Sequence, residues 1–347
     1  MKTQILEWFK TNQKELYNFM QDCSHHHSNG NKNPFHLEGS VWIHTTMVLD
    51  KVNKENINLI FAAILHDVGK IYTRYEKETK VSFRGHENAS MYKSIDILKE
   101  ASKTFDIDVL KILKIVAWHG DLWTKRDNLI EENEHKKNID LKYGNDYDLY
   151  KELLSFVKAD VYGRNVLDEY EILRIEDEFK FLDNYIPYDS TKFTKEKKAK
   201  VYCLIGLSGS GKSTWLKNKN FENYNIISVD KYLEKGKLNY NSVDYEKNIK
   251  KAHDQTLVEI KDTIIKEKNC IIDMTNLTKE TRRKKLSQFP STKYEKIGIV
   301  FLNGEKEIEK NLSKRTDKKI PIEVLKKQLN SFELPGMDEF DVIEYIL

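Results

Sequence analysis

The segment GLSGSGKST at residues 206–214 combines residue types and a spacing that suit the binding of phosphate groups. It matches the pattern G-x-x-x-x-G-K-[S/T] in full, directly after the apolar run VYCLIG and directly before a stretch with helical periodicity. In such a loop, glycines allow backbone N–H groups to surround a phosphate chain, and the N-terminus of the following helix adds its positive dipole. Lys212 is expected to reach the outer phosphates, and Ser213 to coordinate Mg²⁺. The residues predicted to contact ATP or another nucleoside triphosphate are Gly206, Ser208, Gly209, Ser210, Gly211, Lys212, Ser213 and Thr214.

Polar residues end two further apolar runs in the same half of the chain. Asp230 ends the run IISVD, at the edge where an open parallel sheet presents side chains to its ligand. We expect Asp230 to accept the proton of an acceptor hydroxyl; that it only caps the following helix is the alternative. Asp273, in IIDMTN, is predicted to orient the metal or its waters, and Asn276 is predicted to hydrogen-bond to the nucleotide at the same edge.

Arginine is rare in this chain, with eight arginines among 58 basic residues. A planar guanidinium that is always charged suits phosphate oxygens better than an ammonium does. We therefore predict that Arg282 contacts the nucleotide. Arg315 is predicted to approach ATP from a lid at residues 314–321, and an ordinary basic loop is the alternative reading of that segment.

Histidines and aspartates of the first half have the types that hold divalent metals for phosphoester chemistry. Ligands from different helices of a bundle can converge on one site in its core. His44, His66, Asp67 and Asp160 are predicted to hold one ion, and His86 and His119 to help hold a second. Taken alone, each histidine is more often a core or surface residue, so the prediction depends on the set.

The segment between residues 24 and 38 contains further histidines. SHHHSNGNKN, at residues 24–33, is a loop by composition and is predicted to be exposed. His36 and Glu38 follow it and are expected to contribute to the pocket around the metal ligands.

Two types of periodicity indicate the elements that position these residues. Residues 1–185 carry helical spacing almost throughout, notably in 41–65, 86–102, 106–118 and 146–182, which predicts an all-α domain. The polar stretch 186–200 reads as a linker. Residues 201–347 alternate short apolar runs with helical stretches, which predicts an α/β domain with a mostly parallel sheet.

Composition limits the class of protein. The 347 residues are enough for two domains, and a charged fraction of 33% with a hydrophobic fraction of 39% is typical of a globular chain. No apolar run approaches the roughly 20 residues of a membrane span, and the N-terminus lacks a signal-peptide pattern. Three scattered cysteines match no zinc or disulfide framework. We therefore expect a cytoplasmic protein with no membrane partner.

The motifs resemble two known families. GLSGSGKST, SVD, IIDMTNLTKETR and KRT resemble the kinase module of polynucleotide 5′-kinases, which implies that Asp230 is the general base and that Arg315 belongs to the lid. Many members carry an arginine where this chain has Leu233, so recognition of the acceptor's phosphate departs from the family pattern. The metal-ligand set resembles the HD-domain phosphohydrolases. Lys70 and Arg164 lie about one helical turn beyond Asp67 and Asp160 and are expected to reach a substrate phosphate.

The order of the two modules resembles that of the bifunctional HD-Pnk end-healing enzymes. The resemblance implies that the HD domain removes a 2′(3′)- or 2′,3′-cyclic phosphate from the 3′ end of a strand. It also implies that the domain binds two ions of a transition metal such as Mn²⁺. It implies that the kinase phosphorylates a 5′-hydroxyl of RNA or DNA with ATP and Mg²⁺, and that a separate ligase seals the strand. Two alternatives stay open: a small-molecule or nucleoside kinase fused to an HD nucleotide phosphohydrolase, and a regulatory ATP-binding switch without turnover.

Overall fold

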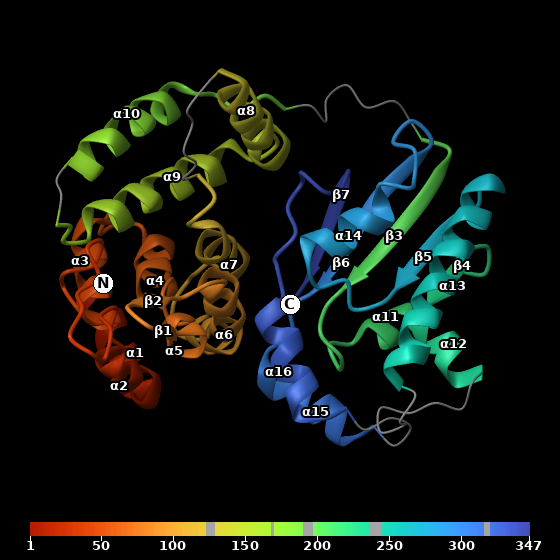
Figure 1. The fold of residues 1–347 in the computed structure, drawn as a ribbon, viewed down its shortest axis with the longest axis horizontal. Helices are drawn as coiled ribbons and strands as arrows, with labels where there is room; N and C mark the ends of the chain where they lie inside the picture. Colours follow the sequence, from red (N-terminus) through yellow and green to blue (C-terminus); the bar gives the residue numbers. More distant parts are fainter. Residues whose placement is uncertain (123–128, 168–169, 190–196, 236–244, 316–319) are drawn as a thin grey trace. The chain divides into compact units, whose positions relative to one another are not determined.

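The computed structural model describes residues 1–347 except 123–128, 168–169, 190–196, 236–244 and 316–319 (Figure 1). The chain divides into two compact units, Met1–Ser190 and Thr191–Leu347. Part of the stretch predicted as a linker, residues 190–196 of 186–200, lies outside the described residues. Within the described part of the chain, no helix combines the length and apolarity needed to cross a membrane.

The N-terminal unit is helical, as predicted. Its helices are α1 (Lys2–Asn12), α2 (Lys14–Asp22), α3 (Val41–Lys51), α4 (Ile57–Leu65), α5 (Lys70–Thr73), α6 (His86–Ala101), α7 (Val109–Trp118), α8 (Leu129–Tyr143), α9 (Tyr147–Tyr162) and α10 (Tyr170–Asn184). A short antiparallel hairpin, which the sequence pattern did not indicate, is formed by β1 (Tyr75–Lys77) and β2 (Lys80–Ser82).

Helix α4 is the central element of this unit, and α3, α7 and α9 pack against it. Its sequence, INLIFAAIL, is apolar at almost every position, and every residue from Leu59 to Leu65 is buried. The Asn56 side chain accepts a hydrogen bond from the Leu59 N–H and so begins the helix. Because α4 ends at Leu65, the next residues, His66 and Asp67, emerge inside the bundle, where both are buried.

Two of the predicted long helical segments are interrupted in the structure. The segment 41–65 is divided by a loop between α3 and α4, where capping by Asn56 begins a new helix. The segment 146–182 is divided between α9 and α10. At Gly163, just after α9, a Cβ atom would lie 2.8 Å from the Cα atom of Val48, so only glycine allows this approach of α9 to α3.

The C-terminal unit alternates strands and helices, as predicted. Its elements are β3 (Ala199–Ile205), α11 (Lys212–Asn218), β4 (Asn225–Ser228), α12 (Val229–Lys235), α13 (Tyr245–Ile265), β5 (Cys270–Asp273), α14 (Lys279–Leu286), β6 (Tyr294–Phe301), α15 (Glu305–Ser313), α16 (Ile322–Ser331) and β7 (Val342–Ile346). Figure 1 shows the strands lying side by side with helices packed around them.

The sheet has five strands in the order β4-β5-β3-β6-β7, and all of its pairings are parallel. Buried Leu204, Ile271 and Phe301 form its core with other apolar side chains. Since parallel strands end at the same edge, the residues after β3, β4 and β5 meet there. In the register, Leu204 and Ser228 both pair with Asp273, which places the phosphate-binding loop and Asp230 at this edge.

Candidate functional site

Four histidines of the N-terminal unit are held in the same tautomer by backbone carbonyl groups. Their Nδ1 atoms lie 2.8–3.1 Å from carbonyl oxygens. The pairs are His44 with Gly163, His66 with Ala63, His86 with Phe83, and His119 with Val116. Because a carbonyl oxygen only accepts, Nδ1 carries a hydrogen in each ring, which leaves Nε2 as the atom that can ligate a metal, as in other metal-binding histidines.

A first group of ligand atoms comes from α3, the end of α4 and α9. His44 Nε2 lies 3.3 Å from His66 Nε2 and 2.9 Å from Asp160 Oδ1, and His66 Nε2 lies 3.6 Å from the same oxygen. This close approach of two imidazole nitrogens and a carboxylate oxygen fits a cation that all three ligate.

A second group repeats this arrangement beside the first. His86 Nε2, from the start of α6, lies 3.3 Å from His119 Nε2 and 3.2 Å from Asp67 Oδ1. Within each group, all the ligand atoms lie within 4.8 Å of one another. The structure thus brings all six predicted ligands of this unit together in two groups.

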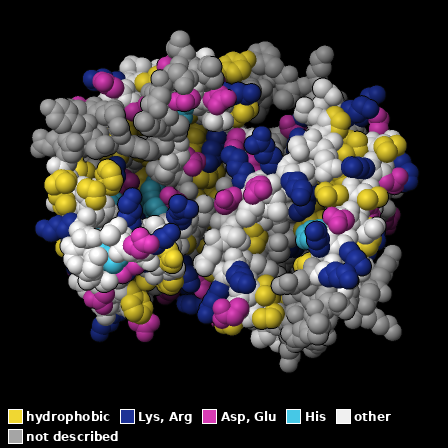
Figure 2. Space-filling view, in the orientation of Figure 1, with side chains coloured by type: hydrophobic (Ala, Val, Ile, Leu, Met, Phe, Trp, Pro, Cys, Tyr) yellow, Lys and Arg dark blue, Asp and Glu magenta, His cyan; other side chains and the backbone are white. Residues whose placement is uncertain are grey.

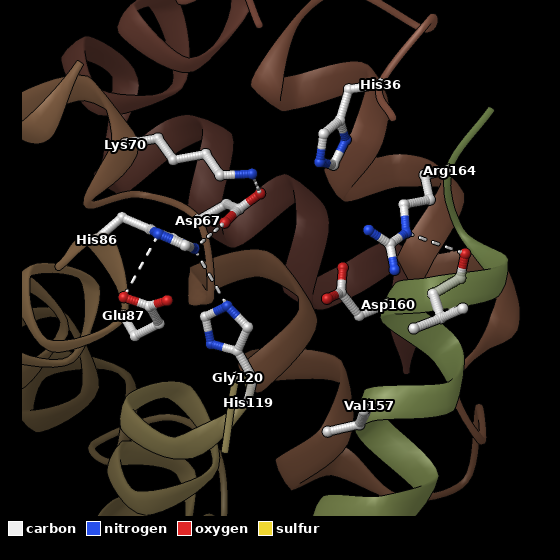
Figure 3. Close-up of a pocket in the computed structure, with 11 residues that line it drawn as sticks. His36, Asp67, Lys70, His86, Glu87, His119, Gly120, Val157, Asp160 and Arg164 are labelled. Atoms are coloured by element: carbon white, nitrogen blue, oxygen red, sulfur yellow. Dashed lines mark hydrogen bonds and ion pairs between the residues drawn. The ribbon is translucent and has the colours of Figure 1, made fainter. Parts of the chain in front are cut away.

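Asp67 faces both groups. Its Oδ2 atom lies 3.3 Å from His66 Nε2 and 3.6 Å from His44 Nε2, while Oδ1 faces His86. The side chain is buried, and its Oδ2 atom lies 2.7 Å from the Lys70 ammonium (Figure 3). Burial opposes the ionisation of Asp67, but the positive charge of Lys70 helps to hold its pKa well below the usual value. An ionised carboxylate with two such oxygens fits a ligand that bridges two cations.

Gly69 explains why Asp67 and His86 approach each other. A Cβ atom at this position would lie 2.3 Å from the carbonyl oxygen of His86 and 2.4 Å from the backbone N of Ser90. The Gly69 N–H also donates to Ser90 Oγ at 2.8 Å. The turn after α4 can therefore rest directly on the first turn of α6.

A pocket of about 300 Å³ opens onto the two groups (Figure 3). Its lining includes Asp67, His86, His119 and Asp160 together with two cationic residues, Lys70 and Arg164. Figure 2 shows histidine side chains at the surface of this unit with lysine and arginine side chains nearby. The pocket therefore combines metal ligands with positive charge, which suits a phosphate ester.

The sequence analysis assigned no role in this site to Glu87 and Gly120, and it predicted wrongly that His25 is exposed. Glu87 and Gly120 line the pocket next to His86 and His119. His25, in the loop predicted to be exposed, is 1% exposed and lies 3.0 Å through Nε2 from Lys70 Nζ. That prediction is wrong for His25 because segment 24–25 pairs with residues 39–40, which draws its side chain inward. Amino-acid composition describes the loop as a whole and cannot identify a single residue whose side chain is buried.

The phosphate-binding loop lies between β3 and α11, as its motif predicts. Gly209 and Gly211 have φ angles of +83° and +92°, a region that other residues rarely adopt. A Cβ atom on Gly209 would also lie 2.9 Å from Leu312 Cγ. Ser213 and Thr214 are exposed in the first turn of α11. The loop therefore has the geometry that an anionic phosphate chain requires.

Lys212 provides the positive charge of this loop. Its ammonium donates to the carbonyl oxygens of Gly206 and Leu207, both at 2.7 Å. Burial lowers the pKa of Lys212 to about 8, and the charges of Asp273 and Asp230 oppose that shift. Burial also raises the pKa of Asp273, against the effect of the Lys212 charge.

Arg315 follows α15 and contributes positive charge near Lys212. Residues 316–319 of the predicted lid lie outside the described residues. The two aspartates and Arg315 are thus near enough to the loop lysine to influence its protonation.

Arg282 and Asn276 have structural roles that contradict their predicted contact with the nucleotide. Arg282 is fully buried; its Nε and Nη2 atoms each donate to Glu339 at 2.8 Å, and Nη1 donates to three backbone carbonyls. Asn276 is 2% exposed; its Nδ2 group donates to backbone carbonyls, and its Oδ1 accepts from Lys285 at 2.6 Å. Arginine and asparagine are residue types that suit a phosphate site, but the sequence does not indicate which groups their side chains hydrogen-bond to.

Three amide side chains brace the loop, and no sequence pattern pointed to them. Asn303 donates to the Ser210 carbonyl at 3.1 Å, and Asn311 to the Gly209 carbonyl at 3.0 Å. Gln328, from α16, accepts from the Ser208 N–H at 2.9 Å and donates to its hydroxyl at 3.0 Å. The N–H of Ser208, predicted to contact the nucleotide, is therefore bonded to α16.

Comparisons with known families agree with the division of the chain into two units. Residues 40–175 match the family described as HD domain, and residues 201–335 match the family described as AAA domain. The chain therefore contains an HD domain followed by a P-loop domain of the kinase-like type, and the predicted order of modules is confirmed.

Two solved structures are similar to parts of the chain. One, titled "Structure of the Pnkp1/Rnl/Hen1 RNA repair complex", is 23% identical over 40% of this chain and 46% of its own, with a TM-score of 0.34. The other, a gluconokinase from Sinorhizobium meliloti 1021, is 16% identical over 44% of this chain and 85% of its own, with a TM-score of 0.32. The chain thus spans less than half of the first structure's length, and neither likeness adds to the family assignment.

Proposed function

We propose that this chain, an HD domain followed by a P-loop AAA domain, is a bifunctional enzyme that heals the ends of broken RNA or DNA strands. Its modules and their residues resemble those of the HD-Pnk end-healing enzymes. The observation that carries the proposal is the pocket in which two metal-ligand groups share Asp67 beside Lys70 and Arg164. The same chain carries a complete phosphate-binding loop.

The HD domain removes the phosphate from a 3′ end. The reaction consumes water: a 2′- or 3′-phosphate leaves as inorganic phosphate and a hydroxyl remains, and a 2′,3′-cyclic phosphate is first opened by another water. Two divalent ions such as Mn²⁺ supply Lewis acidity to the phosphoester when bound by His44, His66, Asp67, Asp160, His86 and His119. Lys70 and Arg164 hold the phosphate oxygens in the pocket.

The P-loop domain transfers the γ-phosphate of ATP to a 5′-hydroxyl. The oxygen–phosphorus bond to ADP breaks as the bond to the 5′-oxygen forms, and Asp230 takes the proton of the hydroxyl. Lys212 and Arg315 stabilise the charge of the transferring group, and Ser213 holds Mg²⁺ with Asp273 nearby.

Two opposite reactions in one chain are compatible because they act on different ends. A strand with a 3′-phosphate and a 5′-hydroxyl needs the first removed and the second phosphorylated before it is sealed. A separate ligase then joins the prepared ends.

The substrate class can be tested with the wild-type protein, ATP labelled at the γ-phosphate, Mg²⁺ and Mn²⁺. We offer an oligonucleotide with a 5′-hydroxyl and a 3′-phosphate, and in parallel a free nucleoside with a nucleoside 3′-monophosphate. The proposal predicts label on the oligonucleotide and release of its 3′-phosphate, with little turnover of the small molecules. Labelling of the nucleoside alone would support a small-molecule kinase, and no turnover of any substrate would support a regulatory switch; both outcomes contradict the proposal.

A further inference from the structure

One wall of the HD pocket contains a second cluster of polar side chains, formed by His25, His36 and Glu38. Its ligand atoms lie within 4.8 Å of one another, as in the two metal-ligand groups. In Figure 3 the imidazole of His36 points into the space above Asp67 and Asp160. Of this cluster, His36 lines the pocket.

The hydrogen bonds of this cluster argue against a third metal ion. His25 lies 3.1 Å through Nδ1 from the Gly39 carbonyl and 3.0 Å through Nε2 from the Lys70 ammonium, so both of its ring nitrogens are engaged. Glu38 Oε1 lies 2.8 Å from His36 Nδ1, and Oε2 accepts the Asn165 N–H at 3.0 Å. The Lys70 ammonium already provides a cation at this place.

The same bonds fix the tautomer of His36. Glu38 has a side chain that is 1% exposed, and its Oε1 atom lies 2.8 Å from His36 Nδ1 and 3.3 Å from His44 Nδ1. A carboxylate only accepts, so Nδ1 of His36 carries the hydrogen, and in the neutral ring Nε2 presents a lone pair.

The ring is also held in place. The His25 ring stacks on it with a centroid separation of 4.2 Å and an interplanar angle of 11°. His25 is itself held by Gly39 and Lys70. His36 therefore presents a rigid hydrogen-bond acceptor to the pocket.

An acceptor in a phosphate pocket needs a donor on the substrate. An ionised phosphate offers only acceptor oxygens, and these are matched by Lys70 and Arg164, not by His36. At the 3′ end of a strand, the donor closest to the phosphate is the hydroxyl on the neighbouring carbon of the ribose. Deoxyribose lacks that hydroxyl, and it is the group by which proteins distinguish RNA from DNA.

We propose that Nε2 of His36 accepts a hydrogen bond from the ribose hydroxyl next to the scissile phosphate, and that the HD site therefore selects ribonucleotide 3′ ends. This inference rests on the proposed function and specifies its substrate. A site built to hydrogen-bond a hydroxyl discriminates against the analogue that lacks it, because its own polar group is then left unpaired.

The test compares two oligonucleotides that differ only in the sugar of the last nucleotide, a ribonucleotide 3′-phosphate and a deoxyribonucleotide 3′-phosphate. The wild type is expected to have a kcat/KM about 10- to 100-fold higher for the ribonucleotide end. His36→Leu is expected to reduce that ratio to about 1, and His36→Gln, whose side-chain oxygen can stand near the position of Nε2, to retain part of it.

Controls separate this role from others. His27→Gln changes a histidine of the same loop that is not among the pocket-lining residues and should keep the wild-type ratio. The Mn²⁺ concentration that gives half-maximal hydrolysis of p-nitrophenyl phosphate, which has no ribose, should not change in His36→Gln; an increase would identify His36 as a metal ligand and overturn the inference. A wild-type ratio near 1, or a ratio that survives His36→Leu, would also overturn it. Failure of the wild type to release phosphate from either end would instead reject the proposed function.

Discussion

At the scale of single residues, side chains of types that suit ligand binding have different roles in the two units. His44, His66, His86 and His119 give their Nδ1 hydrogens to backbone carbonyls and leave Nε2 for a ligand. Arg282, by contrast, uses its guanidinium entirely inside the protein, with Glu339 and three carbonyl groups. Residue type alone does not separate a ligand-binding group from a structural one.

The structural role of Arg282 predicts a large loss of stability on its removal. In Arg282→Ala, Glu339 and three carbonyl groups lose their donor inside the protein, which we expect to destabilise the C-terminal unit by about 3–5 kcal/mol. Urea unfolding of the two variants measures the effect. Arg283→Ala, which removes the exposed neighbour on α14, is the matched control and should change stability by less than about 0.5 kcal/mol. Equal stability of the two variants, with a raised KM for ATP in Arg282→Ala, would restore the original prediction.

The metal ligands could be predicted from the sequence because their residue types suit a divalent cation and the helix ends of a bundle converge. The network of His25, His36 and Glu38 could be predicted only in part. His36 and Glu38 were expected near the pocket, whereas His25 lies in a stretch whose composition indicates exposure. Its burial depends on the pairing of Ser24 with Ser40, which is a tertiary contact between loops.

At the scale of elements, the ends of helices and strands place the functional residues. His66 follows α4, His86 begins α6 and His119 follows α7, so three separate helix ends meet at the pocket. In the other unit, the ends of parallel strands gather the phosphate-binding loop, Asp230 and Asp273. Periodicity predicted these elements well, because apolar spacing reports burial directly. It could not find the breaks within 41–65 and 146–182, which depend on a cap and on a close helix contact.

Helix α16 is linked to the phosphate-binding loop through Gln328, which makes two hydrogen bonds to Ser208. Removal of both bonds in Gln328→Ala should loosen the loop and raise the KM for ATP about fivefold to thirtyfold. The measurement is the KM for ATP in 5′ phosphorylation, with the Kd for ATP from calorimetry beside it. Lys327→Ala changes the exposed preceding residue of α16 and should leave both constants near their wild-type values. If Gln328→Ala bound ATP as tightly as the wild type, α16 would not support the loop.

At the scale of the whole molecule, the chain joins two chemistries that would cancel if they acted on one oxygen. The metal-ligand pocket lies entirely within Met1–Ser190 and the phosphate-binding loop within Thr191–Leu347. Each unit therefore carries its own predicted reacting groups, and a substitution in one leaves the groups of the other in place. A regulatory switch would need neither the shared Asp67 nor the aspartate beside the loop lysine.

The most direct measurement follows both ends of one oligonucleotide, with a 5′-hydroxyl and a 3′-phosphate, in the same reaction with ATP, Mg²⁺ and Mn²⁺. We predict that Lys212→Ala loses 5′ phosphorylation and keeps 3′-phosphate release, and that Asp67→Ala shows the reverse. Lys217→Ala, exposed on α11, and Asp50→Ala, in a surface ion pair with Lys2, should keep both activities. Loss of both activities in either site variant, or no change at either end with the wild type, would contradict the account.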